Sequence, residues 1–202
     1  MLIERPFALL RKFFPDTIWI KPQNAKTVYL TFDDGPTPDV TPHVLDILER
    51  YKVKATFFCV GENVHNNPDL YADILRRGHK TGNHTYNHLK GFNLSVDEYI
   101  DNVLKAEKLI ENNLFRPPYG RITFKQLKAL RPHFDIVMWD LITRDYTPKV
   151  SPKQILNSVE NLARNGSIIV FHDSLKAKHN VLTSLPFVIE SLQQKGYRLD
   201  IL

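Results

Sequence analysis

Short apolar stretches alternate along the chain with stretches in which apolar residues recur every three or four positions. Several apolar stretches, such as Ile168–Phe171, contain no polar residue. Such a stretch is typical of a strand buried on both faces, as parallel strands covered by helices are. The predicted strands are 27–32, 55–60, 79–84, 114–116, 134–139, 167–171 and 197–201.

Helical periodicity and helix-start signals fill the gaps between these strands. Val44, Leu48 and Tyr51 recur at helical spacing, and Ser95-Val-Asp-Glu98 is a capping box. The alternation predicts a parallel α/β fold, either a (β/α) barrel or an open doubly wound sheet. No GxGxxG or GxxxxGK[ST] motif follows a strand, which disfavours a nucleotide-binding version. The predicted helices are 41–51, Pro68 to about Gly78, Ser95 to Ile110, 122–131, Ser151 to Asn165 and Leu182 to Gly196.

The composition suits one globular domain. The 202 residues are 43% hydrophobic and 24% charged, and the formal net charge is +5. This mild positive charge favours anionic partners such as acidic glycans, but the chain has no run of like charges typical of a nucleic-acid arm, so we expect no nucleic-acid partner. Cys59 is the only cysteine, and we interpret it as a core residue.

The first 26 residues precede the first predicted strand. Phe7–Leu10 is their longest apolar run, too short for the core of a signal peptide, and nowhere does the chain reach the roughly 20 apolar residues that span a bilayer. The sequence therefore indicates a cytoplasmic location, although residues 6–14 could form a basic amphipathic helix at a membrane surface. We expect instead that 1–26 packs on a main domain, 27–202. The apolar residues expected to pack there are Leu9, Leu10, Phe13 and Phe14.

Polar residues with reactive side chains follow most of the predicted strands. The carboxyl ends of parallel strands meet at one edge of a barrel or sheet, where active sites lie, so we expect these residues to converge. They are Asp33 and Asp34, His84, Arg116, Asp140 and Asp145, and His172 with Asp173.

Asp33 and Asp34 are adjacent carboxylates whose repulsion and lost hydration call for a compensating cation. Neighbouring side chains on an extended chain point in opposite directions, so one carboxylate could bind a metal while the other faces a substrate. His84 and His88 are four residues apart, and on one helical turn both imidazoles would lie on the same face. Two histidines and a carboxylate are a common catalytic zinc or iron set.

His172 and Arg116 complete the candidate residues. Asp145 could fix the tautomer of His172 and raise the pKa of its imidazole. The Arg116 guanidinium could hold Asp33 in its ionised form. We interpret the other histidines as structural or surface residues: His43, His65, His79, His133 and His179.

Three motifs, taken in order, resemble the polysaccharide deacetylase family, which is carbohydrate esterase family four with its NodB-like domain. They are Thr31-Phe-Asp-Asp-Gly-Pro36, His84-Thr-Tyr-Asn-His88 and Arg116-Pro-Pro-Tyr-Gly120. The resemblance covers about 27–201 and implies a distorted (β/α)7 barrel. It also implies a hydrolase that removes N-acetyl groups from an N-acetylated oligo- or polysaccharide, such as peptidoglycan or chitin oligomers, at the cell envelope or outside the cell.

The resemblance implies that Asp34, His84 and His88 bind the metal. Zinc is the preferred ion, although cobalt, nickel or iron suits the same ligands.

The resemblance also implies the acid and base. Asp33 would be the general base and Arg116 would hold it. His172 would be the general acid, tuned by Asp145. The backbone N–H of Tyr119 would help to bind the oxyanion.

Two further motifs depart from the family pattern. Its fourth motif is commonly DxxDW, whereas this chain has Ile142 and Tyr146 in place of the first Asp and the Trp, and Val170 replaces the usual Leu of the fifth. These positions line the acetyl-methyl pocket in the family, so we expect Ile142, Tyr146 and Val170, with Pro117, to line the substrate pocket. The alternatives are an O-acetyl esterase acting on a xylan-like substrate, another amidase on the same scaffold, and an inactive glycan-binding protein.

Overall fold

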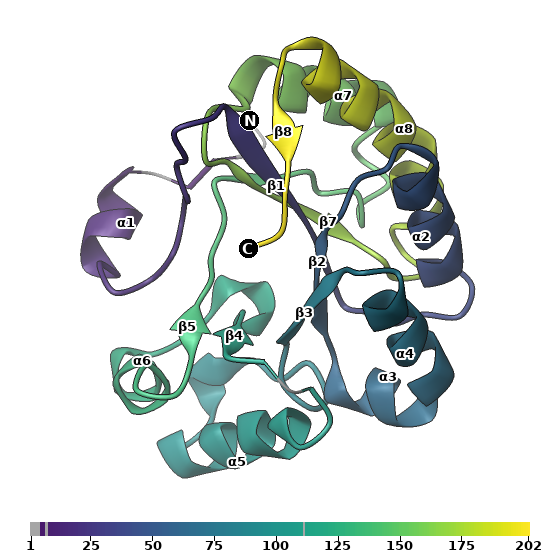
Figure 1. The fold of residues 1–202 in the computed structure, drawn as a ribbon. Helices are drawn as coiled ribbons and strands as arrows, with labels where there is room; N and C mark the ends of the chain where they lie inside the picture. The colour runs from purple at the N-terminus through teal and green to yellow at the C-terminus, as the bar shows by residue number, and fades with distance from the viewer. Residues whose placement is uncertain (1–4, 7, 111) are drawn as a thin grey trace.

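A curled sheet of parallel strands organises the molecule, shown in Figure 1 as a computed structural model that describes residues 5–6, 8–110 and 112–202. All pairings between its named strands are parallel, in the order β5-β4-β3-β2-β1-β7-β6, and β8 pairs with β1. The strands are β1 (Thr27–Asp33), β2 (Thr56–Cys59), β3 (Lys80–Asn83), β4 (Leu114–Phe115), β5 (Asp135–Ile136), β6 (Leu141–Ile142), β7 (Ile168–His172) and β8 (Arg198–Leu199).

The two edges of this sheet belong to one continuous segment. Its first part, β5, pairs with β4, and its second part, β6, pairs with β7. The segment thus passes from one edge of the sheet to the other and curls it into a distorted barrel. With β5 and β6 taken as one interrupted strand, the prediction of a seven-stranded (β/α) barrel is confirmed.

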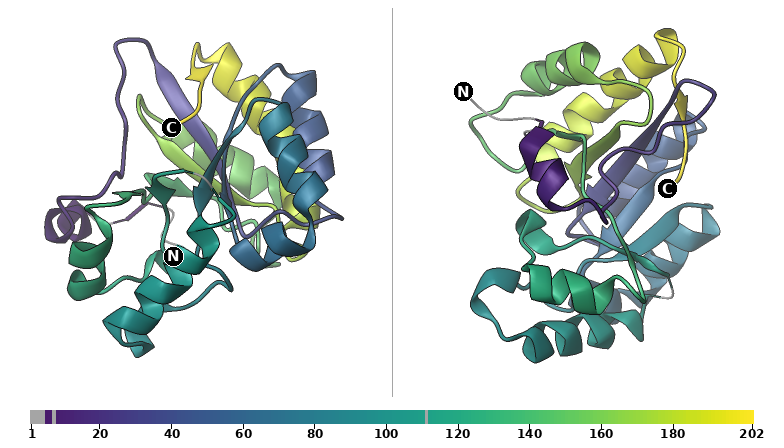
Figure 2. Two further views of the ribbon diagram at one scale, coloured as in Figure 1. Left: turned by 60° about the horizontal axis from the view of Figure 1, so that its bottom comes forward. Right: turned by 90° about the vertical axis from the view of Figure 1, so that its left-hand side faces the viewer.

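The helices lie on the outside of the curled sheet (Figure 2). The capping box predicted at Ser95 is present, and the helix start predicted at Ser151 also forms a capping box. In both, the serine side chain accepts a hydrogen bond from the backbone N–H three residues on. The sequence did not predict the helix α3 (Gly61–Asn66). The helices are α1 (Ala8–Phe13), α2 (Thr41–Arg50), α3 (Gly61–Asn66), α4 (Pro68–Arg76), α5 (Val96–Glu107), α6 (Phe124–Leu130), α7 (Pro152–Leu162) and α8 (Lys178–Gln194). No described helix combines the length and apolarity needed to cross a bilayer.

Alternation along β1 separates the helix-facing core from the barrel interior. Val28, Leu30 and Phe32 belong to the large cluster under α2 and α8, whereas Tyr29 belongs to a second cluster formed with residues of β2, β4 and β7. Because side chains two residues apart share a face, Asp33 ends the strand on the same side as Tyr29. The first candidate carboxylate thus stands at the carboxyl end of the barrel interior.

The segment before β1 runs beside the β5–β6 segment. Ile18 donates a backbone hydrogen bond to Ile136, and Phe14 stacks on Phe124 with ring centroids 4.9 Å apart. Phe13 is 57% exposed, so the expectation that it packs on the domain is wrong. The side chains of Leu9 and Leu10 lie outside the described part of the chain.

Asp140 does not lie where the sequence placed it. Its buried carboxylate accepts hydrogen bonds from Ser167, at the amino end of β7, and from Arg164, and it also pairs with Arg5 and Arg11. The strand does not end at residue 139, because the segment continues into β6. Asp140 therefore anchors the N-terminal segment at the opposite end of the barrel from the other strand-end residues.

Candidate active site

Asp33 and Arg116 form a buried ion pair inside the carboxyl end of the barrel. Arg116 Nη1 lies 2.6 Å from Asp33 Oδ1, and the arginine is fully buried. Other donors of the guanidinium bond to Thr31 Oγ1 and to two backbone carbonyls just after β5, and its Cζ lies 4.0 Å from the centre of the Phe58 ring. A guanidinium held by this many contacts fixes the position of the Asp33 carboxylate.

Asp34, His84 and His88 bring one ligand atom each into a common site, with all three atoms within 4.8 Å of one another. Asp34 Oδ1 lies 3.1 Å from His88 Nε2 and 3.8 Å from His84 Nε2. Burial alone would raise the pKa of Asp34, but the hydrogen bond to His88 and the nearby histidines hold it well below its usual range. The carboxylate is therefore ionised.

The two histidines converge through a loop, not through the predicted helical turn. His84 directly follows β3, and the backbone then turns at Thr85 (φ 64°) and His88 (φ 58°), both in the left-handed region. The expectation of one helical turn is therefore wrong, although the expected convergence is present. The spacing of four residues is compatible with either geometry, and the sequence contains no glycine that would have marked this turn.

The tautomer of His84 suits a metal ligand. Its Nδ1 lies 2.7 Å from the carbonyl oxygen of Arg116, which can only accept, so Nδ1 carries the proton and Nε2 offers its lone pair towards Asp34. Burial lowers the pKa of His84 to about 4, against the opposing charges of Asp33 and Asp34. Metal ligands must be unprotonated, and a hydrogen bond on the second ring nitrogen is the usual support of a ligating histidine. These residues fit a divalent metal.

His172 is paired with Asp145 on the other side of the site. His172 Nδ1 lies 2.7 Å from Asp145 Oδ1, and the backbone N–H of His172 donates to the other carboxylate oxygen at 2.8 Å. Burial alone would lower the pKa of His172, but the charge and hydrogen bond of Asp145, with smaller contributions from Asp34 and Asp33, raise it to about 9. The imidazole is held protonated, with Nε2 available to donate a proton.

Asp173 was expected at this edge of the barrel with the other strand-end residues, but no role was predicted for it from the sequence. Its fully buried carboxylate accepts hydrogen bonds from the backbone N–H of Gly35 at 3.0 Å and from the hydroxyl of Thr41 at 2.6 Å. Its own backbone N–H donates to the carbonyl of Asp33. Burial raises the pKa of Asp173 to about 7 despite these hydrogen bonds. The only sequence signal for Asp173 was its position next to His172. That position does not reveal that the carboxylate bonds to Gly35 and Thr41.

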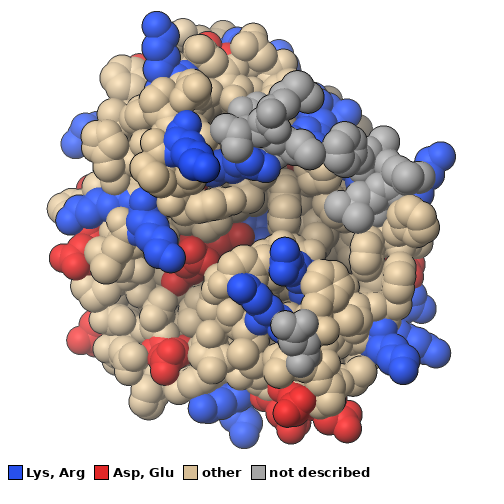
Figure 3. All heavy atoms as spheres, turned by 180° about the vertical axis from the view of Figure 1, so that it is seen from behind, with Lys and Arg blue, Asp and Glu red and all other residues tan. Residues whose placement is uncertain are grey.

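The expected pocket residues differ in exposure, and one of them, Tyr146, contacts the site. Tyr146 is 40% exposed and its ring meets that of His172 edge-on at 4.8 Å. Ile142 and Val170 are register partners on β6 and β7, and both Val170 and Pro117 are buried. Figure 3, which views the molecule from behind, shows acidic side chains in a hollow with Lys and Arg side chains beside it.

Tyr119 lies beside the proposed metal ligands. Its backbone is in the left-handed region (φ 60°), its side chain is 54% exposed, and its ring centroid lies 4.6 Å from that of His88. The structure thus brings the expected metal ligands, the expected acid and base with their partners, and Tyr119 to one centre, whereas Asp140 lies apart.

Comparison with known proteins identifies relatives across almost the whole chain. The family model described as polysaccharide deacetylase matches residues 20–133. A peptidoglycan-N-acetylglucosamine deacetylase of Bacillus cereus is 38% identical, with 94% of each chain covered. A chitooligosaccharide deacetylase of Bradyrhizobium is 32% identical, with 86% of this chain and 88% of the relative covered.

A solved structure with a similar sequence identity confirms the fold. The crystal structure of a peptidoglycan N-acetylglucosamine deacetylase superposes with a TM-score of 0.89 at 36% identity, covering 98% of this chain and 94% of the other.

Proposed function

The chain belongs to the polysaccharide deacetylase family, and from that premise we propose that it is a metal-dependent hydrolase that removes N-acetyl groups from an N-acetylglucosamine-containing glycan. The observation that carries the proposal is the grouping of two separate carboxylate functions around one centre. Asp34 faces two imidazoles, while its neighbour Asp33 is held by Arg116. Relatives of this chain are named as deacetylases of peptidoglycan or of chitooligosaccharides, and both are candidate substrates.

Asp34, His84 and His88 would hold the metal, with zinc preferred and cobalt, nickel or iron also suited to two imidazoles and a carboxylate. When bound, such an ion supplies Lewis acidity that polarises an acetamide carbonyl and lowers the pKa of water. The carbonyl of Arg116 would keep His84 in the required tautomer. This arrangement links the metal site to the residue that also holds Asp33.

Asp33 would accept the proton from the attacking water. A general base has to stay in place while its charge changes, and the Arg116 guanidinium restrains one oxygen of the Asp33 carboxylate at 2.6 Å. The backbone N–H of Tyr119 would donate to the oxygen that becomes negatively charged, because a positioned donor of this kind stabilises the transition state.

His172 would complete the reaction by protonating the leaving amine. An amine is a poor leaving group until it is protonated, and the imidazole held protonated by Asp145 is a ready donor. The products would be acetate and a free amino sugar. Tyr146, Ile142, Val170 and Pro117 would enclose the acetyl group and its sugar.

The experiment that tests the proposal removes the metal with a chelator and restores single divalent ions. Acetate release is then measured on peptidoglycan oligomers, on chitooligosaccharides and on O-acetylated xylan. We expect release from an N-acetylated substrate that disappears with the metal and returns with zinc or cobalt. Full activity in the chelated protein would contradict metal dependence, and release from xylan alone would favour an O-acetyl esterase.

A further inference from the structure

Two loops beside the proposed active centre carry cations that have no carboxylate partner in residues 5–6, 8–110 and 112–202. The first loop follows His88 and includes the short 3-10 helix η1 (Gly91–Asn93). The second follows Arg116 and includes η2 (Pro118–Gly120). They pack closely, because a Cβ on Gly91 would lie 2.8 Å from the carbonyl oxygen of Arg121. Both loops therefore leave directly from residues of the site and stay together.

Each loop places a cation over an aromatic ring of the other. Lys90 Nζ of the first loop lies 4.9 Å from the centre of the Tyr119 ring, and Arg121 Cζ of the second lies 6.0 Å from the centre of the Phe92 ring. The aromatic rings remain 54% and 55% exposed. Cation–aromatic pairs of this kind restrain long side chains without neutralising them. We call these four residues, Lys90, Phe92, Tyr119 and Arg121, the basic wall.

The cations of the basic wall carry uncompensated charge in the part of the chain that the structure describes. Among the described residues, neither Lys90 nor Arg121 forms an ion pair or donates a side-chain hydrogen bond. On the floor of the site, by contrast, Arg116 pairs with Asp33 and His172 pairs with Asp145. An anionic group that enters beside Tyr119 therefore meets positive charge on the wall, while two floor carboxylates are already compensated.

We propose that the basic wall binds a carboxylate carried by the glycan next to the acetylated sugar, so that the enzyme prefers an acidic N-acetylated glycan to a neutral one. The inference rests on the proposed function, because the wall gains this role only if a glycan enters the site. An ammonium and a guanidinium are the side-chain groups that bind carboxylates most readily. A neutral chitooligosaccharide offers them no charged group, whereas the muramic acid of peptidoglycan offers its lactyl carboxylate wherever the stem peptide has been removed.

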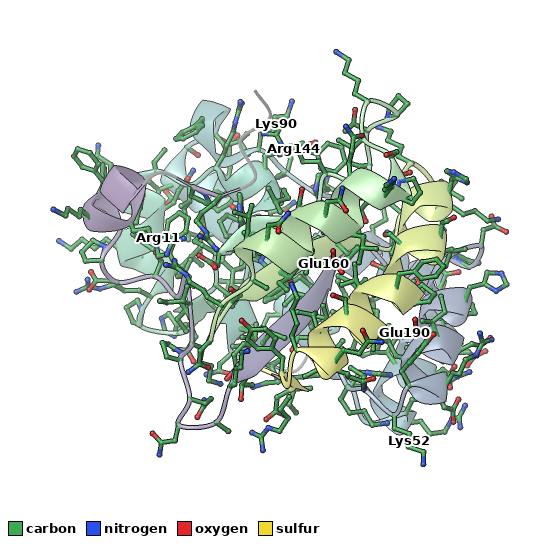
Figure 4. All side chains as sticks on the ribbon, turned by 90° about the horizontal axis from the view of Figure 1, so that it is seen from above. Arg11, Lys52, Lys90, Arg144, Glu160 and Glu190 are labelled. Atoms are coloured by element: carbon green, nitrogen blue, oxygen red, sulfur yellow. The ribbon has the colours of Figure 1, made fainter. Side chains whose placement is uncertain are left out.

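The test uses two forms of one ligand. Peptidoglycan glycan strands freed of their peptides carry lactyl carboxylates, and coupling with methylamine converts these to neutral amides without changing the sugar chain. Binding is measured by calorimetry at low and high salt, and acetate release gives KM and kcat for both forms. The protein variants are the double substitution Lys90→Gln with Arg121→Gln, the charge-preserving Lys90→Arg, and the control Lys52→Gln. Figure 4 shows Lys52 and Lys90 at opposite edges of the molecule.

We expect the wild-type protein to bind the carboxylate form about tenfold more tightly than the amide form at low salt, since exposed charges contribute modestly and are screened. The double variant should lose most of this ratio, while Lys90→Arg and Lys52→Gln should keep it. An unchanged ratio in the double variant, or no binding of either form by the wild-type protein, would overturn the proposal. Preferential binding without acetate release would leave the wall in place and contradict the proposed function instead.

Discussion

The carboxylate of Asp173 occupies the space in which a side chain at Gly35 would begin. An ideal Cβ on Gly35 would lie 2.0 Å from Asp173 Oδ2, closer than nonbonded atoms approach. The same carboxylate accepts the Gly35 N–H and the Thr41 hydroxyl, so it ties the exit of β1 to the start of α2. The turn that follows Asp33 and Asp34 is therefore shaped by a residue at the end of β7.

The first prediction follows from this contact. Gly35→Ala should destabilise the protein by about 2 kcal/mol, within the usual range for overpacking a buried site. Asp173→Ala should also destabilise it, because two buried donors lose their acceptor. Combined, the two substitutions should cost less than their sum, since the methyl group added at Gly35 can use the space that the Asp173 carboxylate leaves. Urea denaturation of the wild-type protein, the two single variants and the double variant measures this coupling. Strict additivity of the losses in unfolding free energy would show that the contact between Gly35 and Asp173 does not cause the destabilisation of Gly35→Ala.

The second prediction compares a buried arginine with an exposed one. Arg116→Met should cost about 3–5 kcal/mol in unfolding free energy, because Asp33 would be left as an uncompensated buried charge. It should also lower kcat by about 100-fold, because the Asp33 carboxylate would lose the contact that holds it in position. The control is Arg131→Met, which breaks the ion pair between Arg131 and Asp16. Both of these side chains are about half exposed.

The control should change the unfolding free energy by no more than about 1 kcal/mol, as expected of an exposed pair. Chemical denaturation and acetate release check the two effects separately. A stable but inactive Arg116→Met protein would show that the arginine acts on catalysis alone, and equal losses in both variants would contradict the distinction.

The sequence predicted the parts of the site whose position depends on local chain geometry. The apolar run of β1 places Asp33 and Asp34 at its carboxyl end, and the convergence of such ends in a parallel barrel brings them to His172 at the end of β7. The capping box at Ser95 and the pair Ser151-Pro152 marked two helix starts correctly, because each signal lies within four residues.

Contacts between distant segments could not be predicted in this way. Asp140 follows an apolar stretch just as Asp33 does, and only the continuation of its segment into β6 turns it towards Ser167. Likewise, the bond between Asp173 and Gly35 joins residues 138 positions apart, and the pairing of Lys90 with Tyr119 depends on how two loops pack. Each of these depends on tertiary geometry that no local pattern encodes.

The third prediction concerns pH. The pKa of His172 is raised to about 9 in the folded protein, above the unperturbed value of about 6.5. The pair with Asp145 therefore stabilises the fold fully below about pH 6.5, and this contribution is lost as the pH rises through about 9. As the general acid, His172 must also be protonated, so kcat/KM should fall on the alkaline side.

Asp145→Asn removes the charge that raises this pKa, so the alkaline limb of kcat/KM should move to lower pH. The control is Asp200→Asn, which removes the carboxylate of an exposed pair with Arg198 and should leave the limb where it is. A pH profile of kcat/KM for the three proteins measures the shift. An alkaline limb unmoved by Asp145→Asn would mean that His172 is not the group that titrates there.

The fourth prediction separates the two adjacent carboxylates. Asp34 faces His84 and His88, whereas Asp33 faces Arg116, so the substitutions Asp33→Asn and Asp34→Asn change the charge equally but affect different partners. A ligand at about a hundred times its dissociation constant stabilises a protein by about 2.7 kcal/mol, which raises the Tm of a domain of this size by about 5–10 °C. Zinc should therefore raise the Tm of the wild-type protein and of Asp33→Asn.

In Asp34→Asn the thermal effect of zinc should be largely lost, because an amide oxygen carries no charge to balance the cation and binds zinc weakly. Asp33→Asn should retain that effect and still release no acetate, since an amide cannot accept the proton of the attacking water. Differential scanning calorimetry with and without zinc, combined with acetate release, separates the two roles. Normal turnover in Asp33→Asn would remove it as the base, and an unchanged zinc response in Asp34→Asn would place the metal elsewhere.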